Sequence, residues 1–174
     1  KNTESKNIYS ILPAHKNHLW LATWGGLYLF SMDTKKSSFH SVSDDAKTQE
    51  LYCIIPLDEN TLLAGGNQGG LRRYNIRLHT WSAPKYFSDS LDRLDFNVRY
   101  MQRLEGKIYI ASEKKNFIEY DPATGELNEF PEFQHISSNA RHFIKLNSTL
   151  WITTDNGLIQ ADWNTKSVIK LWNT

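Results

Sequence analysis

Short apolar phrases recur along this chain at nearly constant intervals. The first, at residues 19–23, reads Leu-Trp-Leu-Ala-Thr, and related phrases begin at Leu62, Ile108 and Leu150. The four starting positions are separated by 43, 46 and 42 residues. The apolar runs are about five residues long and are divided by Gly, Pro or Asn clusters roughly every 8 to 12 residues, a spacing typical of strands rather than helices. The pattern therefore predicts four similar units built of short strands.

Each unit carries the signals of four strands. A leading strand is expected to begin 11 residues before each apolar phrase, at Ile8, Leu51, Asn97 and Asn139. The turn after each phrase ends in Gly or Asn, which tolerate the left-handed backbone of a tight hairpin, and a third strand follows. Weaker fourth strands are expected at 39–42, 80–83, 126–130 and 167–172.

Repeats of about 40 residues with only strand-like content are typical of β-propeller blades. The sequence thus predicts an all-β fold in which residues 1–174 form β-propeller blades. The one stretch whose pattern is compatible with a turn of helix is 88–94, in the longest link between units. The predicted blades span residues 8–42, 51–83, 97–130 and 139–172.

The inner strands are apolar on both faces, as expected for blades that lie between neighbouring blades. Trp20, Tyr109 and Trp151 stand at equivalent positions, and Leu63 replaces the ring in the second unit. Large rings at such positions are expected to pack adjacent blades together rather than to stack on a ligand. Cys53 lies in an inner strand and is expected to be a buried apolar residue.

Composition narrows the classes of function. The formal net charge of +1 provides no global field that would recruit nucleic acid or an anionic membrane. No apolar stretch approaches the roughly 18 residues of a membrane span. The chain opens at Lys1 without a Met, as an excised piece would, so localisation cannot be read from these residues.

The phrases and the turns that follow them resemble a known repeat. Residues 19–28 (Leu-Trp-Leu-Ala-Thr-Trp-Gly-Gly-Leu-Tyr) and 150–158 (Leu-Trp-Ile-Thr-Thr-Asp-Asn-Gly-Leu) are similar to the two-component regulator propeller repeat. That repeat builds the periplasmic sensor region of Bacteroides-type hybrid two-component systems. The resemblance covers all four units, although the second departs at Leu63 and Gly66 and the third at Tyr109, Ser112 and Asn116.

The resemblance implies a non-catalytic sensor segment in the periplasm. It implies a much longer protein, in which two larger propellers precede a small β-sandwich, a membrane span and a histidine kinase. By the resemblance, residues 1–174 would form part of a larger propeller, and any membrane contact would be made by other parts of the protein. Cut propeller edges expose apolar faces, and large apolar patches seldom stay solvated in a monomer. The expected partners are therefore the remaining propeller blades and a second copy in a homodimer.

One rim of the predicted propeller gathers candidate ligand-binding residues. The turns after the apolar phrases should share this rim with the starts of the inner strands and with the links between units. An exposed Trp beside amides, carboxylates and Arg suits an oligosaccharide, since the ring stacks on a sugar face while planar groups bind hydroxyls. The alternative for the two Arg residues is a solvated strand end or an ion pair with a nearby carboxylate. The candidates are Trp24, Asn67, Gln68, Arg99, Arg141, Asp155 and Asn156.

No catalytic, cofactor or metal site is predicted. His15 and His18 lie close together but lack a carboxylate or Cys at ligand spacing. Asp89, Asp92 and Asp95 are spaced like acids on one face of a helical turn, where a solvated link is the alternative to a cation site. No phosphate-binding loop or nucleophile motif appears.

Three functions are consistent with these patterns. The first is a carbohydrate-recognising sensor that signals through domain or subunit packing, and it is the one we favour. The second is a propeller lyase or glycoside hydrolase, whose acids could come from distant units. The third is a scaffold whose rims bind another protein.

Overall fold

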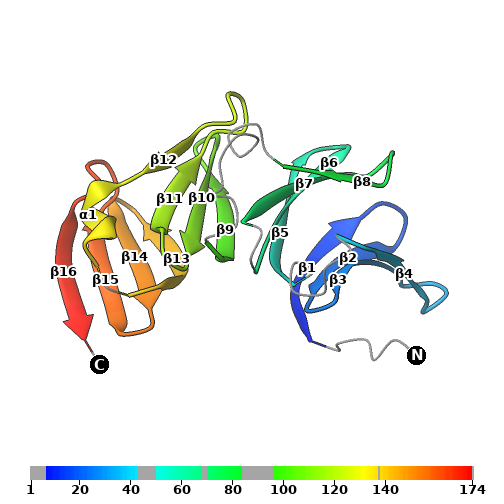
Figure 1. Ribbon diagram of the computed structural model, residues 1–174, viewed down its shortest axis with the longest axis horizontal. Coiled ribbons are helices and arrows are strands. Elements are labelled where there is room, and N and C mark those ends of the chain that lie inside the picture. Colours follow the sequence, from blue (N-terminus) through cyan, green and yellow to red (C-terminus); the bar gives the residue numbers. More distant parts are fainter. Residues whose placement is uncertain (1–6, 43–49, 68–69, 84–95, 137, 174) are drawn as a thin grey trace. The chain divides into compact units, whose positions relative to one another are not determined.

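The computed structural model of the protein describes residues 7–42, 50–67, 70–83, 96–136 and 138–173. Within these residues, sixteen strands form four antiparallel sheets of four strands, and neighbouring strands in each sheet follow one another along the chain (Figure 1). The prediction of an all-β fold made of propeller blades is confirmed. The stretch at 88–94, whose pattern is compatible with a helical turn, lies outside the described residues.

The sheets are called the first to fourth blades. The first contains β1 (Ile8–Ala14), β2 (His18–Thr23), β3 (Gly26–Ser31) and β4 (Ser37–His40). The second contains β5 (Leu51–Asp58), β6 (Thr61–Gly66), β7 (Leu71–Asn75) and β8 (Thr80–Ser82). The third contains β9 (Val98–Leu104), β10 (Lys107–Ser112), β11 (Asn116–Tyr120) and β12 (Leu127–Glu129). The fourth contains β13 (Ala140–Leu146), β14 (Thr149–Thr154), β15 (Gly157–Asp162) and β16 (Val168–Asn173).

The chain divides into two compact units. Unit 1 comprises residues 1–95 with the first and second blades, and unit 2 comprises residues 96–174 with the third and fourth blades. Within a unit, the face of a blade that meets the following blade is called its trailing face, and the opposite face is called its leading face.

In unit 1, the trailing face of the first blade packs on the leading face of the second. Trp20 contacts Tyr74 edge to face, with ring centroids 5.6 Å apart, and both side chains are buried. Leu62 and Ala64 of β6 belong to the same apolar cluster. Cys53 is buried in β5 as predicted.

Unit 2 repeats this arrangement with larger rings. Tyr109 on the trailing face of the third blade packs against Trp163 at a centroid distance of 4.6 Å. Phe117 meets Phe143 of the fourth blade edge to face at 5.0 Å. The predicted packing role is therefore confirmed for Trp20 and Tyr109, which bury large rings between successive blades.

Trp151, the third ring of the predicted column, has a different environment. The described residues contain no blade beyond the fourth, so Trp151 is only half-buried and stacks on Trp172 at a centroid distance of 5.3 Å. Leu63, which replaces the ring in the second blade, is fully buried. The expectation that Trp151 packs between two blades is thus not met within the described residues.

A β-bulge interrupts the leading strand of every blade near its start. The pairing register shifts at Tyr9, Tyr52, Arg99 and Arg141, where one extra residue stands opposite the second strand. Bulges re-aim side chains and bend the strand, and here they do so at equivalent points in all four blades.

Two of the predicted strand starts are one residue too early. The third and fourth leading strands begin at Val98 and Ala140, one residue after the predicted Asn97 and Asn139. The first hairpin of the first blade and that of the second blade are each one residue longer than those of the third and fourth blades. The extra residue lies in the turn at 15–17 in the first blade and in a second register shift between Pro56 and Asp58 in the second. The fourth strands likewise lie within a few residues of their predicted positions.

The link after the third blade contains a short helix that the sequence patterns did not predict. It is α1 (Pro131–Gln134), and Pro131 at its start presets a helical backbone angle. Phe133 is fully buried in the unit 2 core. The Asn116 amide donates to the carbonyl oxygens of Phe133 and Ile136 at 2.7 and 3.1 Å, which holds the link against the sheet.

Candidate functional site

The same backbone hydrogen bond closes one end of every blade. The residue before the leading strand offers its carbonyl oxygen, and the residue after the apolar phrase donates its N–H. The start of each inner strand therefore lies beside the turn that follows the phrase, as the sequence predicted. The donor–acceptor pairs are Trp24 and Asn7 at 3.2 Å, Asn67 and Glu50 at 3.0 Å, Glu113 and Asn97 at 2.9 Å, and Asp155 and Asn139 at 3.2 Å.

Three of these four pairs are also joined through their side chains, each by an amide and a carboxylate. In the third and fourth blades an Asn before the strand donates to an acid after the phrase, with Asn139 2.9 Å from Asp155. In the second blade the two residue types exchange places. The acid Glu50 precedes the strand, and the amide of Asn67 after the phrase donates to it at 2.9 Å. In the first blade Trp24 occupies the position after the phrase.

In unit 2 the bulged arginines join these pairs into one cluster. Arg99 Nε donates to Glu113 Oε1 at 2.7 Å, and its Nη2 contacts the same oxygen. Arg141 donates to Glu113 at 2.5 Å through Nη1 and to Asp155 at 2.5 Å through Nε. Glu113 thus connects the third blade with the fourth, since it accepts from an Arg of each.

The charges of the cluster balance and stabilise one another. Burial opposes ionisation of Glu113, but hydrogen bonds from Asn97 and Arg99 and the two guanidinium charges hold the pKa of its carboxyl below the usual 4.5. The hydrogen bond from Arg141, followed by that from Asn139, likewise lowers the pKa of Asp155. Two guanidinium groups face two carboxylates, so the cluster carries no formal excess charge.

This arrangement agrees with the ion-pair alternative for Arg99 and Arg141. The two arginines and Asp155 lie together, as expected for residues of one rim, but Arg99 and Arg141 both bind Glu113. Glu113 was not among the predicted site residues. The signal that could have identified it is its position, which follows the apolar phrase as Asn67 and Asp155 do.

Unit 1 presents a more aromatic version of the same rim. Trp24 has 45% of its surface exposed on the turn between β2 and β3. The buried Thr23 side chain shapes this turn by accepting from the Gly25 N–H at 3.1 Å and donating to the Gly26 carbonyl at 2.9 Å. The exposed ring is therefore held by a hydrogen-bonded hairpin.

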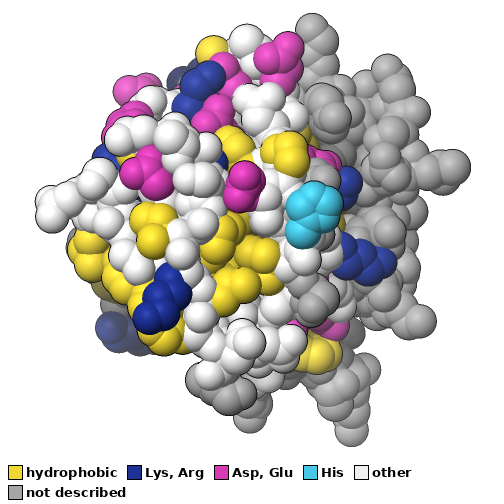
Figure 2. Space-filling model, turned by 90° about the vertical axis from the view of Figure 1, so that its left-hand side faces the viewer, with side chains coloured by type: hydrophobic (Ala, Val, Ile, Leu, Met, Phe, Trp, Pro, Cys, Tyr) yellow, Lys and Arg dark blue, Asp and Glu magenta, His cyan; other side chains and the backbone are white. Residues whose placement is uncertain are grey.

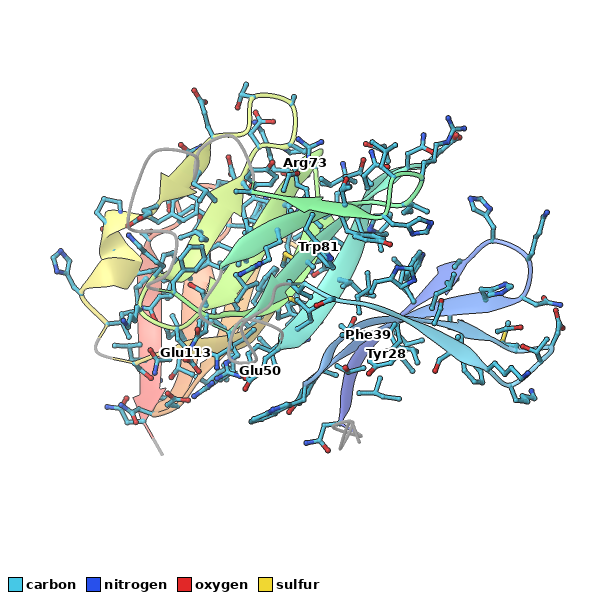
Figure 3. All side chains as sticks on the ribbon, turned by 45° about the vertical axis from the view of Figure 1, so that its right-hand side comes forward. Tyr28, Phe39, Glu50, Arg73, Trp81 and Glu113 are labelled. Atoms are coloured by element: carbon cyan, nitrogen blue, oxygen red, sulfur yellow. The ribbon has the colours of Figure 1, made fainter. Side chains whose placement is uncertain are left out.

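The Glu50 carboxylate organises the neighbouring blade of unit 1. It accepts from the Asn67 amide and, at 2.8 Å, from the Tyr52 hydroxyl. The ring of Tyr52, a bulge residue, meets the bulge residue Tyr9 edge to face at 5.2 Å. Figure 3 labels Glu50 at the start of β5 and, in unit 2, Glu113 after β10. Gln68, also predicted as a site residue, lies outside the described residues.

The last predicted residue, Asn156, lines a shallow pocket of about 280 Å³ in unit 2. Its backbone N–H donates to the Ser138 hydroxyl at 3.2 Å. Trp172, His135 and Asn173 contribute an indole ring and further polar groups to the lining. Asn156 follows Asp155 directly, so this pocket adjoins the charged cluster along the rim.

A metal site would need several His, Cys, Asp or Glu side chains of the described residues to lie close together. No set of three His, Cys, Asp or Glu side chains in that part of the chain lies close enough to hold a metal ion. Asp89, Asp92 and Asp95 lie outside it. None of the helical segments that the structure describes has the length and hydropathy of a membrane span.

Comparisons with known proteins identify similar folds. No protein-family model matches the chain, and no curated protein matches its sequence. Among solved structures, the extracellular domain of the hybrid two-component system BT3049 from Bacteroides thetaiotaomicron superimposes with a TM-score of 0.73 at 17% identity, over 97% of this chain and 24% of that one. The corresponding domain of BT4673 from the same organism gives a TM-score of 0.68 at 18% identity, over 96% of this chain and 24% of that one.

A computationally designed protein, Ika4, is also similar. Its TM-score is 0.60 at 13% identity, and the match covers 99% of this chain and 94% of the designed one. The protein therefore spans about a quarter of the length of the bacterial sensor domains that it resembles, and nearly the whole of a designed chain. At these identities the comparisons establish the fold, and they agree with the resemblance found in the repeats.

Proposed function

We propose that this chain is a ligand-recognition segment of the extracytoplasmic sensor propeller of a hybrid two-component system. In this proposal the segment performs no catalysis, the sensor binds an oligosaccharide, and the longer protein carries a histidine kinase. The remaining blades of the sensor complete the propeller, and the membrane is crossed by other parts of the protein. The location that follows is the periplasm.

The agreement with sensor domains over 97% of the chain is the observation that carries the proposal. The repeated apolar phrase and its turn, which resemble the repeat of such sensors, support it independently of the superposition. The sensor function therefore accounts for both the sequence pattern and the fold.

The chemistry of the rim supports a neutral, hydroxyl-rich ligand. Trp24 exposes an aromatic face on a hydrogen-bonded hairpin, which suits stacking on a sugar ring. The Arg99 and Arg141 charges are balanced by Glu113 and Asp155, so this part of the rim holds no excess charge for an anion. We infer that planar amide and carboxylate groups, rather than net charge, select the ligand.

A titration of oligosaccharides tests the proposal. The intact protein that contains this chain is titrated with a panel of neutral and acidic glycans by calorimetry. We expect at least one neutral oligosaccharide to bind, and we expect Trp24→Ala to weaken that binding about tenfold through loss of ring stacking.

The matched control is Leu78→Ala. Leu78 is 70% exposed and lies in the turn between β7 and β8, at the opposite end of the strands from the candidate rim, so its removal should leave affinity unchanged. Absence of binding to every glycan, together with capture of a defined protein ligand, would overturn the carbohydrate proposal. Equal affinities of wild type and Trp24→Ala would remove Trp24 from the site.

Signal transmission in this proposal uses packing rather than chemistry. Within each unit the two blades meet through apolar faces, and in unit 2 the Glu113 cluster also ties the third blade to the fourth. A ligand that binds one arrangement of blades or subunits better than another shifts the population toward it. The linked kinase would then read a change in packing.

A further inference from the structure

A pocket of about 290 Å³ lies in unit 1 between the first and second blades, at the end of the strands opposite to the candidate rim. Trp20, Leu62 and Ile76 form part of its apolar wall. Asp58 and Glu59, from the turn between β5 and β6, form part of its polar side. The pocket therefore combines an apolar interior with acidic groups.

The walls of this pocket belong to two blades that pack on each other within unit 1, where Trp20 contacts Tyr74. The apolar face of the fourth blade is a different case. Figure 2 looks onto the side of unit 2 that carries β16 and shows hydrophobic side chains gathered in one patch. In the proposed sensor the remaining blades pack on that patch, whereas the pocket in unit 1 needs no further blade to form it.

The turn between β7 and β8, which holds Ile76, has the same hydrogen bonds as the turn between β15 and β16. The Asn75 side chain accepts from the N–H groups two and three residues further on, at 3.0 and 2.9 Å, and the Asp162 side chain does so at 2.9 and 2.8 Å. The N–H groups of Ile76 and Trp163 each donate at 2.8 Å to a carbonyl oxygen in the first hairpin turn of the same blade. Ile76 and Trp163 are therefore equivalent residues with side chains of different size.

In unit 2 the ring of Trp163 fills the corner between the third and fourth blades. It packs against the Tyr109 ring at a centroid distance of 4.6 Å, and Lys145 Nζ lies 4.8 Å from its centroid. Its Nε1 donates to Glu105 Oε2 at 3.2 Å, and only 4% of Trp163 is exposed. The corner in unit 2 is thus occupied by an indole.

The residues around the pocket in unit 1 are the equivalents of those around that indole. Trp20 and Tyr109 are each the second residue of an apolar phrase, and Pro56 and Lys145 each pair with the first residue of one. Trp20, Pro56 and Ile76 all line the pocket. The pocket is therefore the place that an indole ring occupies in unit 2, and it stays open in unit 1 because Pro56 and Ile76 are smaller than their equivalents.

The charges at the pocket favour a cation. Among the described residues that line it, Asp58 and Glu59 carry negative charges and none is Lys or Arg. The Asn60 N–H donates to Asp58 Oδ1 at 2.8 Å and holds that side chain in place. A cationic group on an aromatic ligand is attracted both by carboxylates and by the face of an indole such as Trp20.

From this equivalence we propose that the pocket binds a small aromatic ligand that carries an amine. The ligand ring takes the place that the Trp163 indole has in unit 2 and packs against Trp20, and its ammonium group lies near Asp58 and Glu59. A volume of about 290 Å³ is near the lower end of the roughly 300–1,000 Å³ of small-molecule pockets, so the site suits one fused ring rather than an oligosaccharide. The site is separate from the candidate rim and does not rest on the proposed carbohydrate ligand.

Calorimetric titration of the intact protein with three probes of similar shape tests the proposal. Tryptamine is cationic, indole is neutral and indoleacetate is anionic. We expect tryptamine to bind about fivefold more tightly than indole, since exposed charge pairs contribute little, and indoleacetate to bind more weakly than both.

Ile76→Trp fills the pocket with the ring found in unit 2 and should abolish binding of tryptamine and indole. The matched control is Leu78→Trp, which adds the same ring at a 70% exposed position of the same turn, outside the pocket lining, and should bind like the wild type. Asp58→Asn and Glu59→Gln, made together, keep the shapes of the side chains but remove both charges. This double variant should bind tryptamine no more tightly than indole, while its affinity for indole stays unchanged.

Several results would overturn the proposal. Absence of binding by both tryptamine and indole at millimolar concentration would show that the pocket takes no aromatic ligand. Wild-type affinity in Ile76→Trp, with the variant folded by circular dichroism, would place the binding elsewhere. Indoleacetate that binds as tightly as tryptamine, or a tryptamine affinity that survives the loss of both acids, would exclude the amine. Both acids are exposed, so the double variant should fold and decides the matter even where Ile76→Trp does not fold.

Discussion

Replacement of Glu113 by Gln tests how far one carboxylate holds the third and fourth blades together. In the structure Glu113 accepts hydrogen bonds from Asn97, Arg99 and Arg141, and only 16% of its side chain is exposed. Gln keeps the shape of Glu but loses its charge, and its amide nitrogen turns a donor toward groups that are themselves donors. The substitution therefore changes charge and hydrogen bonding with little change in volume.

The expected loss of stability follows from the three residues that donate hydrogen bonds to Glu113. A hydrogen bond to a charged group contributes about 1 kcal/mol more than one between neutral groups. Three such differences give about 3 kcal/mol, and solvent screening at Arg141, whose side chain is 40% exposed, reduces the sum to about 2 kcal/mol. We expect this loss in the free energy of unfolding of unit 2.

Urea denaturation measures the loss, and amide hydrogen exchange in β9 and β13 assigns it to unit 2. The matched control is Glu129→Gln in the same unit. Glu129 pairs with Lys115 at 2.7 Å across a more exposed contact, so its substitution should cost less than about 0.5 kcal/mol.

The difference in the free energy of unfolding between wild type and Glu113→Gln should also depend on pH. The folded-state pKa of Glu113 is lowered, so its contribution to stability is present above the ordinary value of 4.5 and is lost as the pH falls through the folded-state value. The difference in stability between the two proteins should therefore become smaller below pH 4.5. A Glu113→Gln protein as stable as the control, or a gap that stays constant in acid, would refute the reasoning.

Two further predictions concern unit 1. In Gly66→Ala the new Cβ would stand 1.9 Å from a backbone carbonyl oxygen, so the substitution should destabilise the protein by about 3 kcal/mol in urea melts. In Gly25→Ala the nearest atoms are 3.9 Å away, so its effect should stay below about 1 kcal/mol, and similar losses in both variants would contradict the packing argument. Burial and the charge of His79 lower the pKa of His40 below 6.5, and its Nδ1 lies 2.6 Å from the hydroxyl of buried Tyr74. Because the folded state disfavours protonated His40, stability should be kept above pH 6.5 and lost as the pH falls below it. His40→Phe should flatten this pH dependence of stability. If the stability of that variant depends on pH as the wild type's does, His40 is not the group responsible.

The strand pattern was readable from the sequence because it is local. The phrase at 19–23 and its three equivalents combine strand-forming residues with turns ending in Gly or Asn, and these signals lie within a few residues of each other. The packing roles of Trp20 and Tyr109 were predictable for the same reason, since equivalent positions in a repeat have equivalent environments. The short helix α1 was missed because it depends on the burial of Phe133 and on hydrogen bonds from Asn116, 17 and 20 residues away.

The candidate rim was predictable only in part. The shared rim of Arg99, Arg141 and Asp155 followed from strand direction, but their partner Glu113 was not identified. A carboxylate that follows a strand has no distinctive local pattern, and its significance arises from two arginines that reach it from different blades. The one-residue error at Asn97 and Asn139 has a similar origin, since the extra residue in the first hairpins of the first and second blades leaves no strong local signal.

The sequence by itself determined the number of repeats, the strand content of each and the turns that separate them, because these depend on side chains close together in the chain. The tertiary structure alone decided which polar groups at the rim neutralise one another and which apolar faces stay uncovered. Those outcomes depend on how neighbouring blades pack. A side chain such as Trp151 is buried or exposed according to what lies on the far side of its sheet, and a local pattern holds no record of that.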